Sequence, residues 1–165
     1  MIKVTLYLIL LTITAMTHGY DRLTGESFAS RSEVIGQNGM VATSHPLATQ
    51  IGLDTLKNGG NAIDAAIAAN IALGLMEPTG NGIGGDLFAI VWSAKDKMLY
   101  GLNASGPAPQ DISIDYIKSK GLKKIPSFGP LPVSVPGAVD GWIKLHERFG
   151  NINFENLFEP TIKYA

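Results

Sequence analysis

A glycine-rich loop is the first segment of this sequence whose pattern could do chemistry. Residues Gly80–Gly85 read Gly-Asn-Gly-Ile-Gly-Gly, which matches the G-x-G-x-x-G spacing of dinucleotide-binding loops. That chemistry needs a strand before the loop and a helix after it, so that phosphate meets the helix N-terminus. Here a helical pattern, Ala62–Met76, precedes the loop, and a strand pattern, Leu87–Trp92, follows it. The loop is therefore interpreted as a tight backbone turn, and no cofactor is expected.

The other polar residues form no complete catalytic or metal-binding set. The three histidines are scattered, with no second histidine or carboxylate at ligand spacing, and His146 on its helix flank is expected to be solvated. Asp86, at the exit of the glycine loop, could orient another group, although capping a turn is its more ordinary role. The serines considered as nucleophiles lack the glycine-flanked context of a nucleophile elbow: Ser44, Ser93, Ser105 and Ser134.

Composition excludes several classes of protein. The 165 residues carry 13 Lys and Arg against 14 Asp and Glu, so the net charge of −1 offers no bulk attraction for nucleic acid, and no nucleic-acid partner is expected. The chain has no cysteine, which excludes a disulfide scaffold, a cysteine-ligated zinc site and a cysteine nucleophile. With 45% hydrophobic and 16% charged residues, the chain is typical of a globular domain rather than a disordered one.

The N-terminus resembles an export signal. Lys3 precedes Val4–Met16, an uncharged and mostly apolar run that is short for a membrane span, and Thr17 and Gly19 suit a cleavage site before Tyr20. Residues 1–19 are therefore predicted to be a signal peptide and the protein to be exported to the periplasm or the extracellular space. Two alternatives stay open: an uncleaved membrane anchor, and a core helix or strand at the start of a domain.

Helical patterns alternate with one hairpin pattern. We expect a buried strand over Gly39–Ser44, a helix capped by Ser44 that ends at Asn58–Gly60, and a buried helix over Ala62–Met76 capped by Asn61 and Asp64. The runs Leu87–Trp92 and Met98–Asn103 predict a β-hairpin. Three further helical segments are expected: Ile114–Lys120, Ala138–Phe149 and a short piece starting at Phe154–Leu157. This order predicts an α+β architecture.

The helix over Ala138–Phe149 is expected to be amphipathic. Its apolar residues recur at helical spacing, and Gly150 closes it. The side chains predicted to face inward are Val139, Trp142, Ile143, Leu145 and Phe149. The prolines of the preceding run, Ser127–Pro136, predict an extended segment.

Five stretches, in this order and spacing, together resemble the gamma-glutamyltransferase family. Each is weak alone, but the ordered set is specific and, with the helix begun by Glu159–Ala165, covers nearly all of residues 36–165. The stretches are Gly39–Ala48, Gly59–Ala66, Glu77–Gly85, Leu102–Pro109 and Val133–Trp142.

The resemblance implies an N-terminal-nucleophile hydrolase with a four-layer αββα fold. Such precursors cut themselves into a large and a small subunit, and the threonine exposed on the small subunit attacks a gamma-glutamyl amide such as glutathione. Residues 20–165 are then the N-terminal portion of the large subunit, an incomplete fragment that lacks the catalytic threonine. The implied partners are a small-molecule gamma-glutamyl peptide and the small subunit from the same precursor.

One substrate contact of the family falls inside this segment, and the sequence departs from it. Family members carry an arginine here that binds the α-carboxylate of the substrate, whereas the matching stretch Leu102–Pro109 has Ser105 at that position and Gly106 after it. A serine hydroxyl cannot replace a bidentate arginine–carboxylate pair. Ser105 is thus the candidate substrate-binding position. Two alternatives stay open: a related amidase or acylase with a non-glutamyl substrate, and a non-catalytic truncated copy.

Overall fold

The computed structural model describes residues 34–165. The chain divides into two units, 1–37 and 38–165, and the second contains all the helices and strands of the described residues. The predicted signal peptide, residues 1–19, lies outside the described residues. None of the helices described within 34–165 is long and apolar enough to cross a membrane.

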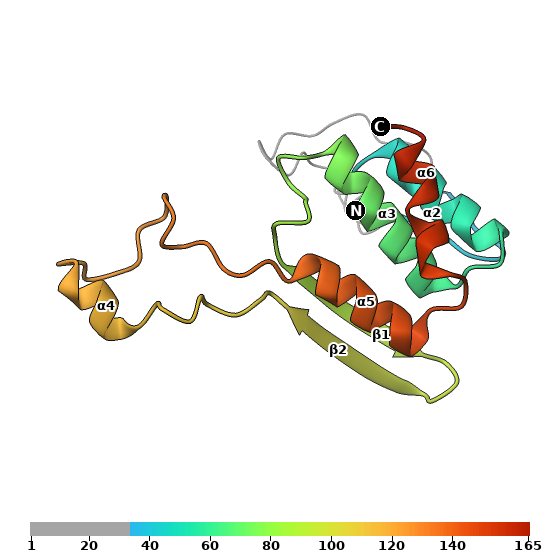
Figure 1. Cartoon of the computed structure of the whole chain (residues 1–165). Helices are drawn as coiled ribbons and strands as arrows, with labels where there is room; N and C mark the ends of the chain where they lie inside the picture. The colour runs from blue at the N-terminus through green and yellow to red at the C-terminus, as the bar shows by residue number, and fades with distance from the viewer. Residues whose placement is uncertain (1–33) are drawn as a thin grey trace, which may run out of the picture. The chain divides into compact units, whose positions relative to one another are not determined.

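A helical layer and a β-hairpin make up this second unit. The helices are α2 (Pro46–Lys57), α3 (Ala62–Met76), α4 (Ile114–Ser119), α5 (Ala138–Phe149), the 3-10 helix η1 (Phe154–Leu157) and α6 (Glu159–Ile162). The strands β1 (Leu87–Ser93) and β2 (Met98–Ala104) pair antiparallel. Figure 1 shows α5 lying along the hairpin, with α2, α3 and α6 grouped above α5 in this view. The predicted α+β class is confirmed.

Helix α3 is central because its own sequence gives it both a firm start and an apolar surface. Asn61 accepts the N–H groups of Ile63 and Asp64, while Asp64 accepts the N–H of Asn61, which completes the predicted capping box. Gly59, with φ of +93°, makes the left-handed exit from α2 that leads into this cap. The core then joins α3 to its neighbours through Ala48, Ile51, Ile67, Ala68, Ile71, Ala72, Trp142, Leu145 and Leu157.

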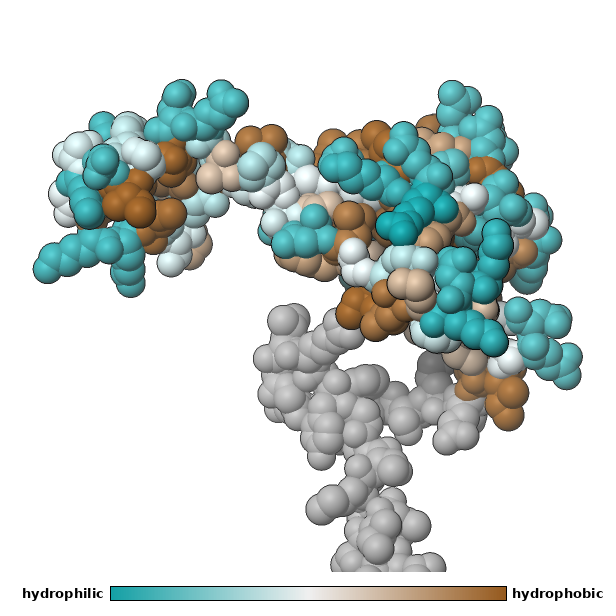
Figure 2. Space-filling view, turned by 90° about the horizontal axis from the view of Figure 1, so that it is seen from below, coloured by the Kyte–Doolittle hydropathy of each residue, from teal (hydrophilic) through white to brown (hydrophobic). Residues whose placement is uncertain are grey.

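The two faces of the hairpin differ in what covers them. Leu87, Ala89, Val91 and Leu102 pack against the helical core. The opposite face carries Phe88, Ile90, Trp92 and Leu99, which are all exposed, with Ile90 at 80%. The register Ile90–Gly101 and Trp92–Leu99 places these side chains on one surface. Figure 2 shows hydrophobic residues reaching the surface of the described part in several places.

Helix α4 lies on a long loop between β2 and α5 (Figure 1). Ser113 caps it by accepting the N–H of Tyr116, and Gly121, with φ of +72°, follows its end. Its apolar residues gather among themselves, bordered by lysines, around a small hollow lined by Ile112, Ile114, Ile117, Leu122 and Ile125. The run 127–136 forms no helix or strand, as its prolines predict.

Three local expectations were wrong. Gly39–Ser44 is not a strand: no strand of the described residues pairs with it, and Met40 is exposed. His45, not Ser44, caps α2, because its Nδ1 accepts the N–H of Leu47 while the Ser44 hydroxyl donates to Glu77. On α5, Val139 and Ile143 stay more than a third exposed, because the face that packs inward centres on Trp142 and Leu145.

Candidate functional site

The candidate position Ser105 lies where β2 ends. Its backbone N–H donates to the Asn103 side-chain oxygen at 3.0 Å, a short-range bond that turns the chain out of the strand. Gly106 follows with φ of +78°, a conformation that favours glycine. The sequence Asn-Ala-Ser-Gly therefore presents Ser105 on a sharply turned loop at the strand end, and its role there stays a prediction.

Two backbones cross in contact next to Ser105. A Cβ on Gly106 would collide with the Val135 carbonyl oxygen, and a Cβ on Gly137 would collide with the Ala104 carbonyl oxygen. The Val135 N–H also donates to the Pro107 carbonyl at 3.0 Å. Such a close approach requires glycine in both segments, at Gly106 and at Gly137. The loop that carries Ser105 is therefore held against the start of α5.

The glycine loop reaches the same place from a third direction. The Gly85 carbonyl accepts the N–H groups of Gly137 and Ala138, each at 3.1 Å, and so satisfies two free donors at the start of α5. The Ser134 hydroxyl lies 3.5 Å from Asp86 Oδ1 and 3.4 Å from the Ser105 carbonyl oxygen, both long contacts. Three separate sequence motifs thus meet at the end of β2.

The interpretation of the glycine loop as a turn agrees with its surroundings. It follows α3 and precedes β1, the reverse of the order that a dinucleotide site needs. Asn81 fixes it by donating to the Asn70 carbonyl at 2.7 Å, and the Trp142 indole donates to the Asn70 side chain at 2.8 Å. The loop is therefore anchored to α3 and α5 and serves as a structural connection.

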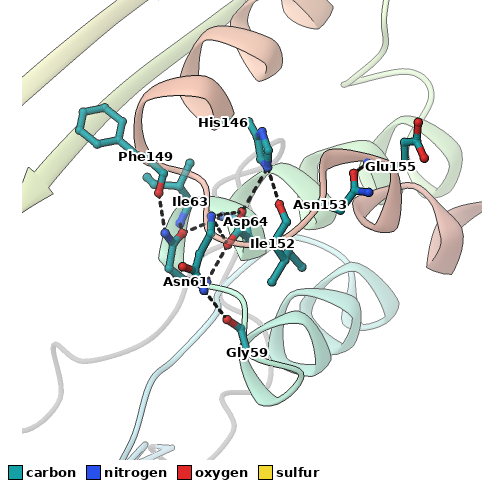
Figure 3. Close-up of polar contacts among 10 residues, drawn as sticks. Gly59, Asn61, Ile63, Asp64, His146, Phe149, Ile152, Asn153 and Glu155 are labelled. Carbon is teal, nitrogen blue, oxygen red and sulfur yellow. Dashed lines mark hydrogen bonds and ion pairs between the residues drawn. The ribbon is translucent and has the colours of Figure 1, made fainter.

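The histidines lie apart from this site, and His18 falls outside the described residues. His146 is not solvated as expected: its ring is largely buried, Nε2 donates to the Ile152 carbonyl at 2.7 Å and lies 3.8 Å from the buried Asp64 (Figure 3). The neighbouring Glu147 predicts an exposed helix flank, but residues after α5, including Ile152, cover the ring. Within residues 34–165 no three His, Asp or Glu side chains gather as metal ligands.

A pocket of about 520 Å³ opens where these segments meet. Its lining residues include Ser105, Gly106 and Pro107 from the loop after β2, together with Gly137 at the start of α5. Two charged residues that the sequence reasoning missed, Asp140 and Lys144, also line it and form an ion pair at 2.5 Å. Asp140 lies within the Val133–Trp142 stretch and Lys144 follows it, and their i, i+4 spacing on one helix is the signal that could have found them.

Comparisons with known proteins agree with this arrangement. A model of the gamma-glutamyltranspeptidase family matches residues 48–165. The glutathione hydrolase proenzyme of Bacillus subtilis (strain 168) is 39% identical over 135 residues, which is 79% of this chain and 23% of that protein. Glutathione hydrolase 3 of Arabidopsis thaliana is 36% identical over 140 residues, 84% of this chain and 22% of that protein. The chain spans about a quarter of the length of these relatives.

Solved structures extend the likeness to the fold. Helicobacter pylori gamma-glutamyltranspeptidase has a TM-score of 0.73 at 33% identity, covering 81% of this chain and 39% of that one. A cephalosporin acylase from Bacillus halodurans has a TM-score of 0.76 at 48% identity, covering 89% of this chain and 27% of that one. The expected kinship with N-terminal-nucleophile hydrolases is thereby confirmed for this α+β part. The chain belongs to the gamma-glutamyltranspeptidase family.

Proposed function

We propose that the protein to which this chain belongs hydrolyses or transfers the gamma-glutamyl group of small peptides such as glutathione. The family match over residues 48–165 carries this proposal, supported by relatives named glutathione hydrolase at up to 39% identity. The proposed substrate is a small molecule, and the reaction cleaves the amide bond between the glutamyl side-chain carbonyl and an amine.

The proposed chemistry uses a threonine that lies outside this chain. Its hydroxyl attacks the amide carbonyl, the amine leaves with a proton, and a glutamyl ester remains on the enzyme. Water or the amine of an amino acid then attacks the ester and regenerates the threonine. We propose that self-cleavage of a precursor exposes this threonine on a small subunit, which assembles with residues 20–165 and the rest of the large subunit.

Residues 34–165 would position the substrate rather than react with it. The crossing of the Gly106 and Gly137 backbones fixes the loop that carries Ser105, and the Gly85 carbonyl fixes the start of α5. In this proposal Ser105 stands beside the acyl group, where a hydroxyl supplies one hydrogen bond and no charge. We also propose that residues 1–19 direct export, with cleavage before Tyr20.

Turnover by the full-length protein tests the proposed function. Glutathione and a gamma-glutamyl anilide are expected to be cleaved, with release of glutamate or of a glutamyl dipeptide when an amino acid is added. An amide with an unrelated, uncharged acyl group is the comparison, since the acylase of Bacillus halodurans is 48% identical to this chain. Cleavage of that amide with no cleavage of either gamma-glutamyl substrate would overturn the proposal.

Export has its own test. Fractionation of the source cells, followed by N-terminal sequencing of the mature protein, is expected to find it outside the cytoplasm and starting at Tyr20. A mature protein that retains Met1 in a membrane fraction would instead support the uncleaved anchor.

A further inference from the structure

The pocket at the end of β2 contains one positive and one negative side chain among its lining residues. Lys144 and Asp140 both line it, along with Ser105 and Asn103. The four groups offer an ammonium, a carboxylate, a hydroxyl and an amide around a space of about 520 Å³. That volume lies within the range of pockets that hold small organic ligands.

The Asp140–Lys144 pair is accessible and held on a fixed support. Both side chains are 58% exposed, so each keeps much of its hydration and their mutual attraction is weak. The helix beneath them is anchored by the buried Trp142, on the opposite face, and by the bonds from its first N–H groups to the Gly85 carbonyl. The helix backbone therefore holds the two side chains next to each other, and because their mutual attraction is weak, each can exchange its contact for a ligand charge at little cost.

The head of a gamma-glutamyl group carries a matching pair of charges. Its α-ammonium and α-carboxylate share one carbon atom, as a cation and an anion side by side. Lys144 attracts the carboxylate and Asp140 attracts the ammonium, so a zwitterion inserted against the pair satisfies both charges at once. Resting on the proposed function, we propose that Asp140 and Lys144 bind the zwitterionic head of the acyl group, in place of a cation at Ser105.

This assignment explains how the pocket recognises a carboxylate although position 105 carries a serine and not an arginine. The serine hydroxyl is neutral, whereas Lys144 brings a full charge to the same pocket from α5. Asp140 lies in the first turn of α5, where the helix dipole favours its negative charge. The proposal makes both residues specificity determinants, which set KM rather than the rate of the chemical step.

Three substrates separate the two contacts in the full-length protein. A gamma-glutamyl anilide carries both head charges, a glutaryl anilide lacks the ammonium, and a 4-aminobutanoyl anilide lacks the carboxylate. Lys144→Met is expected to raise KM about tenfold for the gamma-glutamyl and glutaryl substrates only. Asp140→Asn is expected to raise KM about tenfold for the gamma-glutamyl and 4-aminobutanoyl substrates only.

The matched control is an ion pair of similar exposure on another helix. Lys57 and Asp54 pair at 3.1 Å on α2, and neither lines this pocket. Lys57→Met and Asp54→Asn are expected to leave all three KM values within twofold of wild type. Lys144→Gln, which keeps a polar side chain, is expected to repeat the pattern of Lys144→Met.

The outcomes separate this inference from the proposed function. If wild-type protein cleaves the gamma-glutamyl anilide but Lys144→Met and Asp140→Asn shift all three KM values equally, or none, the binding assignment is overturned and the proposed function stands. If wild-type protein cleaves only substrates without the glutamyl head, the proposed function fails and the assignment falls with it. The assignment is supported only if Lys144→Met leaves KM for the 4-aminobutanoyl anilide unchanged and Asp140→Asn leaves KM for the glutaryl anilide unchanged, while each variant raises the other two KM values.

Discussion

The Asp64 carboxylate accepts the backbone N–H of Asn151 through both oxygens at 3.1 Å, across 87 residues of sequence. The same carboxylate accepts the Asn61 N–H at 2.8 Å, and Asp64 is fully buried. Two further hydrogen bonds join the same two segments. The Asn61 side-chain amide donates to the Phe149 carbonyl, and the Asn151 side-chain amide donates to the Gly59 carbonyl at 2.9 Å. One side chain therefore ties the start of α3 to the turn after α5.

Asp64→Asn is expected to destabilise the protein by about 3 kcal/mol. The amide keeps one acceptor oxygen but places an NH₂ group against backbone N–H donors, which then have no partner in a buried setting. Urea unfolding of the full-length protein, followed by circular dichroism, measures the loss. Asp111→Asn, in an exposed loop, is the control and is expected to change stability by less than about 0.5 kcal/mol. Equal effects of the two changes would contradict this role for Asp64.

Gly137→Ala is expected to disrupt the site more than the fold around α3. The new methyl group would overlap the Ala104 carbonyl oxygen, so the loop that carries Ser105 must move away from α5. Hydrogen exchange is expected to speed up at Val135 and Ala138, whose N–H groups donate across this junction, and to stay unchanged within α3. Gly82→Ala is the control because a Cβ there meets nothing within 4 Å. If Gly137→Ala leaves the exchange rates of Val135 and Ala138 unchanged, the segments around Gly106 and Gly137 do not pack as tightly as these contacts require.

The sequence predicts the helices and the hairpin well because their signals are local. Asn61 and Asp64 cap α3 as expected, and the apolar runs of β1 and β2 pair as a hairpin. The expected strand at Gly39–Ser44 fails because an apolar run becomes a strand only beside a partner, and a partner is not a local property. His146 is buried for a similar reason, since the chain that covers it, through Ile152, returns only after α5 ends.

The candidate site was harder to predict than the fold. Ser105 could be singled out by comparison with a family pattern, but its neighbours could not, because Ser134 and Asp140 come from segments far along the chain. The many glycines indicate that some backbone segments approach closely, but the sequence does not identify which glycines are in contact. The crossing of Gly106 and Gly137 becomes visible only in three dimensions.

Acid is expected to remove a small stabilising contribution of Asp54. The Gln50 amide and then the Lys57 ammonium lower the pKa of this carboxyl below its usual value. A lowered folded-state pKa contributes stability above the unfolded-state pKa, about 3.9, and that stability is lost as pH falls through the folded pKa. At pH 7 wild type is expected to exceed Asp54→Asn in unfolding free energy by less than about 1 kcal/mol, because the pair is exposed.

Urea titrations of the full-length protein at several pH values check this dependence. The difference between wild type and Asp54→Asn is expected to shrink steadily below pH 4, as the carboxyl protonates in both states. A difference that grows on acidification would reverse the sign and exclude the assigned contacts.

The open face of the hairpin predicts how residues 34–165 behave when expressed alone. Phe88, Ile90, Trp92 and Leu99 form an exposed apolar surface, which favours association or a loosely packed state. The isolated segment is expected to bind the dye ANS and to melt without a sharp transition. Ile90→Lys is expected to reduce ANS binding because it places a charge at the centre of this surface, whereas Lys97→Arg in the hairpin loop is the neutral control. A sharp two-state melt of the unmodified segment would contradict the prediction.

Ser105→Arg is expected to lower KM for gamma-glutamyl substrates in the full-length protein. A guanidinium at this position lines the same pocket as Lys144 and can bind a carboxylate with two parallel hydrogen bonds, which corresponds to about a tenfold change. If the introduced guanidinium and Lys144 serve one carboxylate, their effects are not additive, and the gain is expected to be larger in a Lys144→Met background. Kinetics of wild type, both single variants and the double variant give this coupling directly.

Ser93→Arg, in the hairpin away from the pocket, controls for the added positive charge. Equal decreases in KM from Ser93→Arg and Ser105→Arg would mean that Ser105 does not face the substrate head.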